Sequence, residues 1–149
     1  MGLDMYLSAR RYLSVYKEED KEILEVLDNI DVGQNGMKVK EIVYDAMYWR
    51  KANAIHRWFV QHCQSGIDDC REAYVPTDLI RDLVHDCEIT LKNKGRAKEL
   101  MPTQEGFFFG STDIDDGYFE DLQNTVDTLK PLLERQDINN FDFYYRASW

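Results

Sequence analysis

The chain has 149 residues, 44% hydrophobic and 31% charged, and a net charge of -10. This length predicts one globular domain over residues 1–149, and the surplus acid excludes general binding to nucleic acid or anionic membranes, whose phosphates it repels. No apolar run approaches the roughly 20 residues of a membrane span. Three cysteines, an odd number, and an N-terminus without a signal-peptide pattern predict a cytoplasmic protein with free thiols.

The first part of the chain has the pattern of two strands joined through a helix. Residues 3–12 alternate apolar Leu3, Met5 and Leu7 with polar positions, which predicts a strand. Residues 17–30 carry apolar side chains at helical spacing behind an acidic first turn, which favours a short amphipathic helix. Residues 32–36 have turn composition, and residues 37–44 carry the Val and Ile of a second strand.

Three longer segments complete the expected fold. A helix is predicted over residues 47–64, a second from Thr77, as its cap, to Gly95, and a third over 115–135 with a kink or early end at Pro131. The tail 141–149 alternates like a strand and ends in Trp149, which we expect to be docked. The sequence thus predicts an α+β fold, a small, mostly antiparallel sheet packed by about three amphipathic helices.

Several familiar site motifs fail on spacing. The segment 106–112, GFFFGST, lacks the lysine and the glycine spacing of a phosphate loop, so we interpret it as a buried strand or bend, with a pocket wall as the alternative. The acidic run from Asp113 to Asp121 does not match a calcium loop, and a helix start explains it better than a divalent metal site. The cysteine and histidine spacings suit no zinc site, so we expect neither a structural metal nor a cofactor.

Residues 48–59, YWRKANAIHRWF, form the richest constellation, because aromatic rings alternate with cationic and amide donors. Trp49 and its helical neighbours are expected in the core. Arg50, Asn53 and Arg57 lie at spacings of three and four, which on one helix predicts a polar stripe. That stripe is either a salt-bridge face for the surplus acids or a face that recognises an anion and a base.

The segments MGLDMYL, YWRKANAIHRWF, PTQEGFFFGST and FDFYYRASW together resemble a family of small proteins of tailed phages and their bacterial hosts. The resemblance spans nearly the whole chain. It implies a phage-borne accessory protein in the host cytoplasm, of the kind that acts against host enzymes or host defence. It transfers no catalytic residue.

The leading hypothesis is a protein that binds and sequesters a small anionic, nucleotide-like ligand without catalysis, because a local set of cationic and aromatic groups can hold a compact anion even on an acidic chain. The alternative is an acidic inhibitor of a basic host protein. A third hypothesis is a magnesium-dependent phosphoryl-transfer or hydrolytic enzyme that uses Asp113, Asp115, Asp116 and Asp121. An oligomer is compatible with all three. The candidate ligand-binding residues are Arg50, Lys51, Asn53, Arg57, Trp58, Ser111, Thr112 and Arg146.

Overall fold

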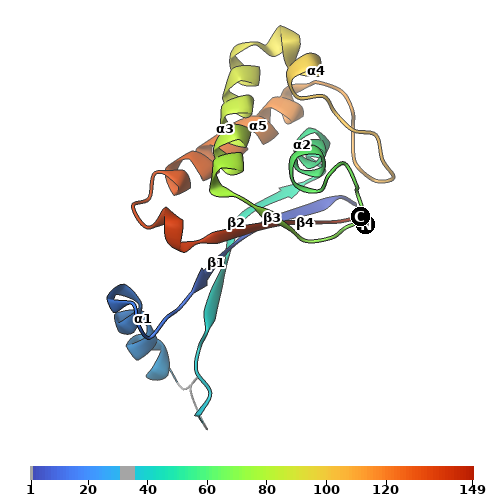
Figure 1. Ribbon diagram of the computed structural model, residues 1–149. Helices are drawn as coiled ribbons and strands as arrows, with labels where there is room; N and C mark the ends of the chain where they lie inside the picture. The colour runs from blue at the N-terminus through green and yellow to red at the C-terminus, as the bar shows by residue number, and fades with distance from the viewer. Residues whose placement is uncertain (1, 31–35) are drawn as a thin grey trace.

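The fold is built on one four-stranded sheet in which every pairing is antiparallel and the strand order is β2-β1-β4-β3. The computed structural model describes residues 2–30 and 36–149. Helices α2, α3 and α5 cover one face of the sheet and leave the other face open (Figure 1). The predicted α+β fold is confirmed. The strands are β1 (Asp4–Tyr12), β2 (Glu41–Arg50), β3 (Ala73–Val75) and β4 (Asp142–Ser148).

The alternation seen in the sequence decides which face of the sheet is buried. Leu3, Met5 and Leu7 are at most 1% exposed, while Tyr6 between them lies on the open face. Met5 pairs with Trp49 of β2 and with a β4 residue, so one row of inward side chains runs across three strands. Burying large apolar side chains on one face holds the strand register, because a slip of one residue would expose them all.

Four of the helices, α1, α2, α3 and α5, are those that the sequence predicts, and the short α4 is additional. α3 and α5 pack on each other above the sheet, and the short α4 follows α3 through a 3-10 turn. No helix in the ranges 2–30 and 36–149 is long and apolar enough to cross a membrane. The helices are α1 (Glu18–Asp28), α2 (Asn53–Cys63), α3 (Thr77–Lys92), α4 (Ala97–Leu100) and α5 (Asp116–Leu133), with 3-10 turns η2 (Lys94–Arg96) and η3 (Ile138–Asn140).

The boundary between β2 and α2 differs from the prediction. Residues 47–50 belong to the strand, and the helix begins only at Asn53. Antiparallel pairing with β1 continues as far as Asp4 and Arg50. These backbone hydrogen bonds between strands hold residues 47–50 in a strand, although their side-chain pattern also fits a helix. The expected stripe of Arg50, Asn53 and Arg57 on one helix is therefore wrong.

α1 lies at the far end of the β1–β2 pair, away from the other helices (Figure 1). Its first turn is fixed by buried Asp20, which accepts a hydrogen bond from Arg11 at 2.9 Å and from the amide of Ser14 at 3.0 Å. Val26 and Ile30 are exposed, and no apolar residue of α1 belongs to the hydrophobic core. The predicted turn at residues 32–36 falls mostly outside the described residues, of which only Gly36 is included.

Smaller differences concern the ends of elements. Thr77 is the first residue of α3 and not its cap, because Pro76 occupies the cap position. Pro131 lies inside the last turn of α5, which ends two residues later at Leu133. The three phenylalanines of residues 107–109 form a turn in which only Phe109 is buried, so the buried-strand interpretation is wrong and the bend is right. Trp149 is docked on one side only, since half of it remains exposed.

Candidate functional site

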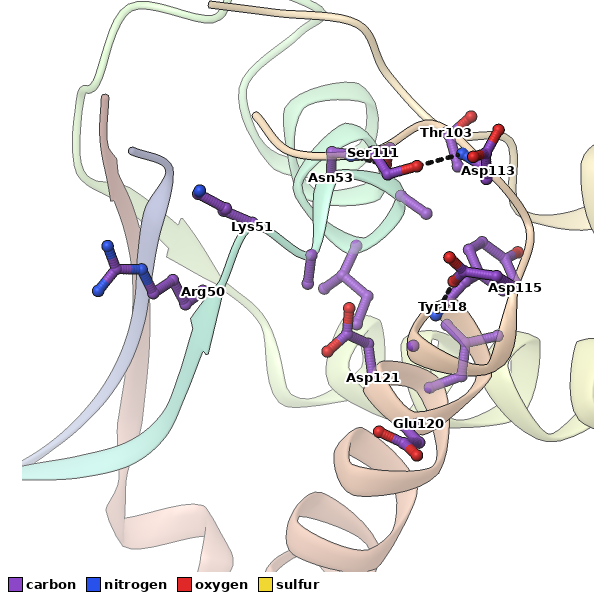
Figure 2. Close-up of a pocket in the computed structure, with 15 residues that line it drawn as sticks. Arg50, Lys51, Asn53, Thr103, Ser111, Asp113, Asp115, Tyr118, Glu120 and Asp121 are labelled. Atoms are coloured by element: carbon purple, nitrogen blue, oxygen red, sulfur yellow. Dashed lines mark hydrogen bonds between the residues drawn. The ribbon is translucent and has the colours of Figure 1, made fainter. Parts of the chain in front are cut away.

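A cavity of about 300 Å³ opens between the turn from β2 into α2 and the first turns of α5. Its volume is at the small end of the range for ligand sites in proteins. Figure 2 shows the turn on one side and the start of α5 on the other. The lining comes from segments far apart in the sequence: Arg50, Lys51, Ala52, Asn53, Ala54, Ile55, Thr103, Ser111, Asp113, Asp115, Gly117, Tyr118, Glu120, Asp121 and Leu122.

The turn at the edge of the cavity has a strained backbone at Lys51. Its φ is 57°, in the left-handed region that a lysine rarely adopts, which costs on the order of 1 kcal/mol. Gly110, at φ 89°, approaches so closely that an added Cβ would lie 3.0 Å from the Cβ of Lys51. The amide of Lys51 donates to the carbonyl of Leu3 at 2.8 Å, which holds the turn against β1. Such strain is concentrated at functional sites in proteins.

Asn53 ties this turn to the loop that carries Ser111. Its amide group donates to the carbonyls of Phe109 at 3.1 Å and Ser111 at 2.9 Å, and its side-chain oxygen accepts from the amide of Gln104 at 3.2 Å. Asn53 is 3% exposed, and both polar atoms of its side chain are hydrogen-bonded within the protein. Its role is to shape the wall of the cavity, and a ligand would meet its neighbours.

The start of α5 supplies the opposite, acidic wall. The side chain of Asp115 caps α5 by accepting from the amide of Tyr118 at 3.1 Å, as expected for a helix start in this acidic run. Asp121 lies one turn further on, and in Figure 2 its carboxylate points toward the turn that begins α2. Among the described residues none donates a side-chain hydrogen bond to Asp121 or forms an ion pair with it.

The surroundings of Asp121 disfavour its charge. Burial raises the pKa of this carboxyl to about 6, and the nearby charges of Glu120 and Asp115 act in the same direction. Asp121 is therefore ionised at neutral pH but without a partner. A donor or a cation brought by a ligand would stabilise it.

Lys51 is the cationic side chain at this end of the cavity. Arg50 contributes to the lining, but its side chain lies on the open face of the sheet, because Arg50 pairs in register with Asp4 on the face opposite buried Trp49. Neither residue forms an ion pair within the described part of the chain, although acidic residues outnumber basic ones by 28 to 18. In Figure 2 both side chains extend away from Asp115 and Asp121. α2 also begins here without a side-chain cap and without an acid in its first turn, so its positive end is left for an anion. Opposite charges are thus separated along the site.

Four of the eight predicted binding residues meet at this cavity, namely Arg50, Lys51, Asn53 and Ser111. The other four lie elsewhere. Arg57 and Trp58 line a separate cavity of about 160 Å³, where the Trp58 indole donates to Asp86 at 2.8 Å and stacks on His62. Thr112 contributes its carbonyl to a bond with Thr103, and Arg146 lies on the open face of the sheet, paired in register with Tyr6.

The sequence reasoning missed the acidic wall as part of this site. The run from Asp113 to Asp121 carries a recognisable helix-start signal, but nothing in it indicates that α5 begins opposite Lys51. Asp116 does not line the cavity. Among the described residues, no group of three or more His, Cys, Asp or Glu side chains is placed to hold a metal ion.

The raised pKa of Asp121 predicts how stability depends on pH. A group whose folded pKa exceeds its unfolded value of 3.8 loses its favourable contribution as pH rises through about 6. Asp121→Asn should therefore be more stable than the wild type by about 1–3 kcal/mol at pH 8, and the difference should vanish near pH 4. Urea unfolding at both pH values measures it. Asp127→Asn, an exposed change on the same helix, serves as control and should stay within about 0.5 kcal/mol of the wild type at both.

No family model, curated protein or solved structure matches this chain.

Proposed function

We propose that the chain is a non-catalytic binding protein, a phage-type accessory protein, that captures a small nucleotide-like ligand in the cavity between the β2–α2 turn and α5. The observation that carries the proposal is the separation of unpaired charges along one cavity. Lys51 and the uncapped start of α2 stand at one side, and Asp121 stands without a partner among the described residues at the other. A nucleotide carries complementary groups at its two ends: its phosphate matches the positive side of the cavity, and the hydrogen-bond donors of its base match the negative side.

Between the charged ends the lining is apolar beneath its surface. Ile55 and Leu122 are fully buried and hold the cavity in shape, and Tyr118 beside them is 7% exposed. The phosphate end would meet Lys51 and the uncapped start of α2, an arrangement that binds anions in many proteins. The cavity volume of about 300 Å³ favours a mononucleotide over a longer ligand.

The state of the hydroxyl groups supports binding without chemistry. The Tyr118 hydroxyl donates to the carbonyl of Met101 at 2.7 Å, and burial raises its pKa far above its ordinary value. Ser111 uses its hydroxyl oxygen to accept the amide of Asp113 at 3.0 Å. A nucleophile needs a base to take its proton. Among the described residues no basic side chain is hydrogen-bonded to either hydroxyl, and both hydroxyls instead help to hold the cavity together.

Replacing Lys51, the cation at the cavity, should remove much of the affinity. We expect Lys51→Ala to bind a nucleoside monophosphate at least about 10-fold more weakly than the wild type, since a charged hydrogen bond to phosphate is lost. Isothermal titration calorimetry measures the affinity. The matched control is Arg57→Ala, which removes a cation from α2 outside this cavity and should leave binding unchanged.

The melting temperature of Lys51→Ala separates loss of contact from loss of fold. Lys51 is exposed, so the variant should melt within a few degrees of the wild type. If Lys51→Ala folds and binds as tightly as the wild type, the cation does not hold the ligand and the proposed site is wrong.

A second candidate function is favoured by α1, the helix outside the core. Segment 17–30 around it carries six acids and two lysines, and Val26 of the helix and Ile30 just after it are exposed. An amphipathic helix of this kind can dock into an apolar groove of a basic protein, which matches the alternative of an acidic inhibitor. α1 lies far from the cavity (Figure 1), so substitutions at Val26 and Ile30 should impair such docking without affecting the ligand.

A further inference from the structure

The acidic wall of the cavity restricts which bases a nucleotide ligand could present. Asp115 has one oxygen engaged by the amide of Tyr118 at 3.1 Å, whereas neither oxygen of Asp121 has a bonded donor among the described side chains. Asp121 is partly buried and its carboxylate faces the cavity (Figure 2). A carboxylate with two free oxygens accepts most strongly from two parallel N–H groups on a planar partner.

The common bases differ in whether they offer such a pair. Guanine presents a ring N–H directly beside an exocyclic amino group, so both oxygens of a carboxylate receive a hydrogen. Adenine and cytosine place an unprotonated ring nitrogen beside their amino group, and its lone pair would face a carboxylate oxygen. Uracil offers one N–H between two carbonyls, which repel the carboxylate. An ionised Asp121 therefore matches the guanine edge and conflicts with the other three.

We infer that the site selects a guanine mononucleotide, with Asp121 accepting from the base edge and with Lys51 and the uncapped start of α2 binding the phosphate. This inference rests on the proposed function and names its ligand class. Asp113, Asp115 and Glu120 add negative charge at the base end. They keep a phosphate away from that end and so fix the direction in which the nucleotide enters.

The test is a calorimetric titration of the whole protein at pH 7.5 with four nucleoside monophosphates: GMP, IMP, AMP and UMP. IMP differs from GMP only in lacking the exocyclic amino group. We expect GMP to bind at least about 10-fold more tightly than IMP, because one charged hydrogen bond is lost, and AMP and UMP to bind more weakly still. Asp121→Asn should reduce GMP affinity by at least about 10-fold and change IMP affinity less, whereas Asp127→Asn should change neither.

The outcomes separate the inference from the function on which it rests. Equal affinity for all four nucleotides, a preference for AMP or UMP, or a GMP preference that survives in Asp121→Asn would overturn the guanine assignment and leave nucleotide binding standing. No binding of any of the four by folded protein would overturn the proposed function and the inference together. A melting curve for Asp121→Asn confirms that the variant is folded.

Discussion

Deleting residues 140–149 is expected to abolish folding. The deletion removes β4, which lies inside the sheet and pairs with β1 on one side and β3 on the other. Phe143 and Tyr145 of β4 are fully buried, and a buried aromatic side chain contributes about 3–5 kcal/mol. The loss of two such side chains equals much of the 5–15 kcal/mol that typically stabilises a domain. Circular dichroism and solubility of the truncated chain measure the effect.

The matched control for this deletion removes Trp149 alone. The Trp149 side chain is half exposed, and its indole donates to Asp68 at 3.1 Å while its ring meets the edge of Phe109. Its removal should lower stability by at most about 1–2 kcal/mol and leave a cooperative melt. A truncated chain lacking residues 140–149 that melts like the wild type would show that the last strand is not part of the folded core.

His56→Ala should lower the free energy of unfolding by about 3–5 kcal/mol, because it leaves a cavity and a buried hydroxyl without its acceptor. His56 is fully buried, and its Nδ1 lies 2.6 Å from the hydroxyl of Tyr145 while its Nε2 lies 2.9 Å from a carboxylate oxygen of Asp68. The carboxylate requires that Nε2 carry the hydrogen, so Nδ1 accepts from Tyr145. The imidazole thus links β4 to the segment that follows α2.

A double-mutant cycle isolates the hydrogen bond from the cavity. Tyr145→Phe removes the hydroxyl, so adding it to His56→Ala should cost less than the sum of the two single changes. His62→Ala provides the matched control, because His62 lies on the same helix but is exposed, and it should cost less than about 1 kcal/mol. Denaturant unfolding supplies all the free energies. Strict additivity would contradict the proposed bond between His56 and Tyr145.

The parts of the fold that the sequence predicts well are those with one clear period. Leu3, Met5 and Leu7 at one end and Phe143 and Tyr145 at the other alternate strictly, and all five face the core. β2 is predicted less well, because an aromatic side chain such as Trp49 is buried equally by a strand or by a helix in this position. Only pairing with β1 decides between the two, and that pairing is not visible in a local pattern.

α1 shows a second limit of periodicity. Its apolar positions predict an amphipathic helix correctly, but the same pattern does not say whether the apolar side faces the protein's own core. Val26 and Ile30 remain exposed, and the helix is held at its first turn by the ion pair of Arg11 and Asp20. Arg11 lies in β1 and Asp20 in α1, nine positions later. No local sequence pattern predicts that two such charged side chains will pair.

The sequence indicates each side of the candidate site separately, but it does not indicate that the two sides meet. Lys51 stands out in the sequence for its cationic side chain, and the acidic run around Asp121 is recognisable as a helix start. Their meeting at one cavity depends on how α5 packs across β2, which links segments about 70 residues apart. Arg57 and Trp58 join the predicted site only if Arg50 lies on their helix, and the strand boundary removes that connection.

The most direct test of the central claim is to locate the ligand on the protein by nuclear magnetic resonance. A titration of isotopically labelled protein with GMP should shift the amide signals of residues 50–55 and 111–121, the two sides of the cavity. The same titration on the Lys51→Ala variant should produce much smaller shifts at equal concentrations. Shifts confined to the open face of the sheet around Tyr6 and Arg146, or to the second cavity beside Arg57, would contradict the account.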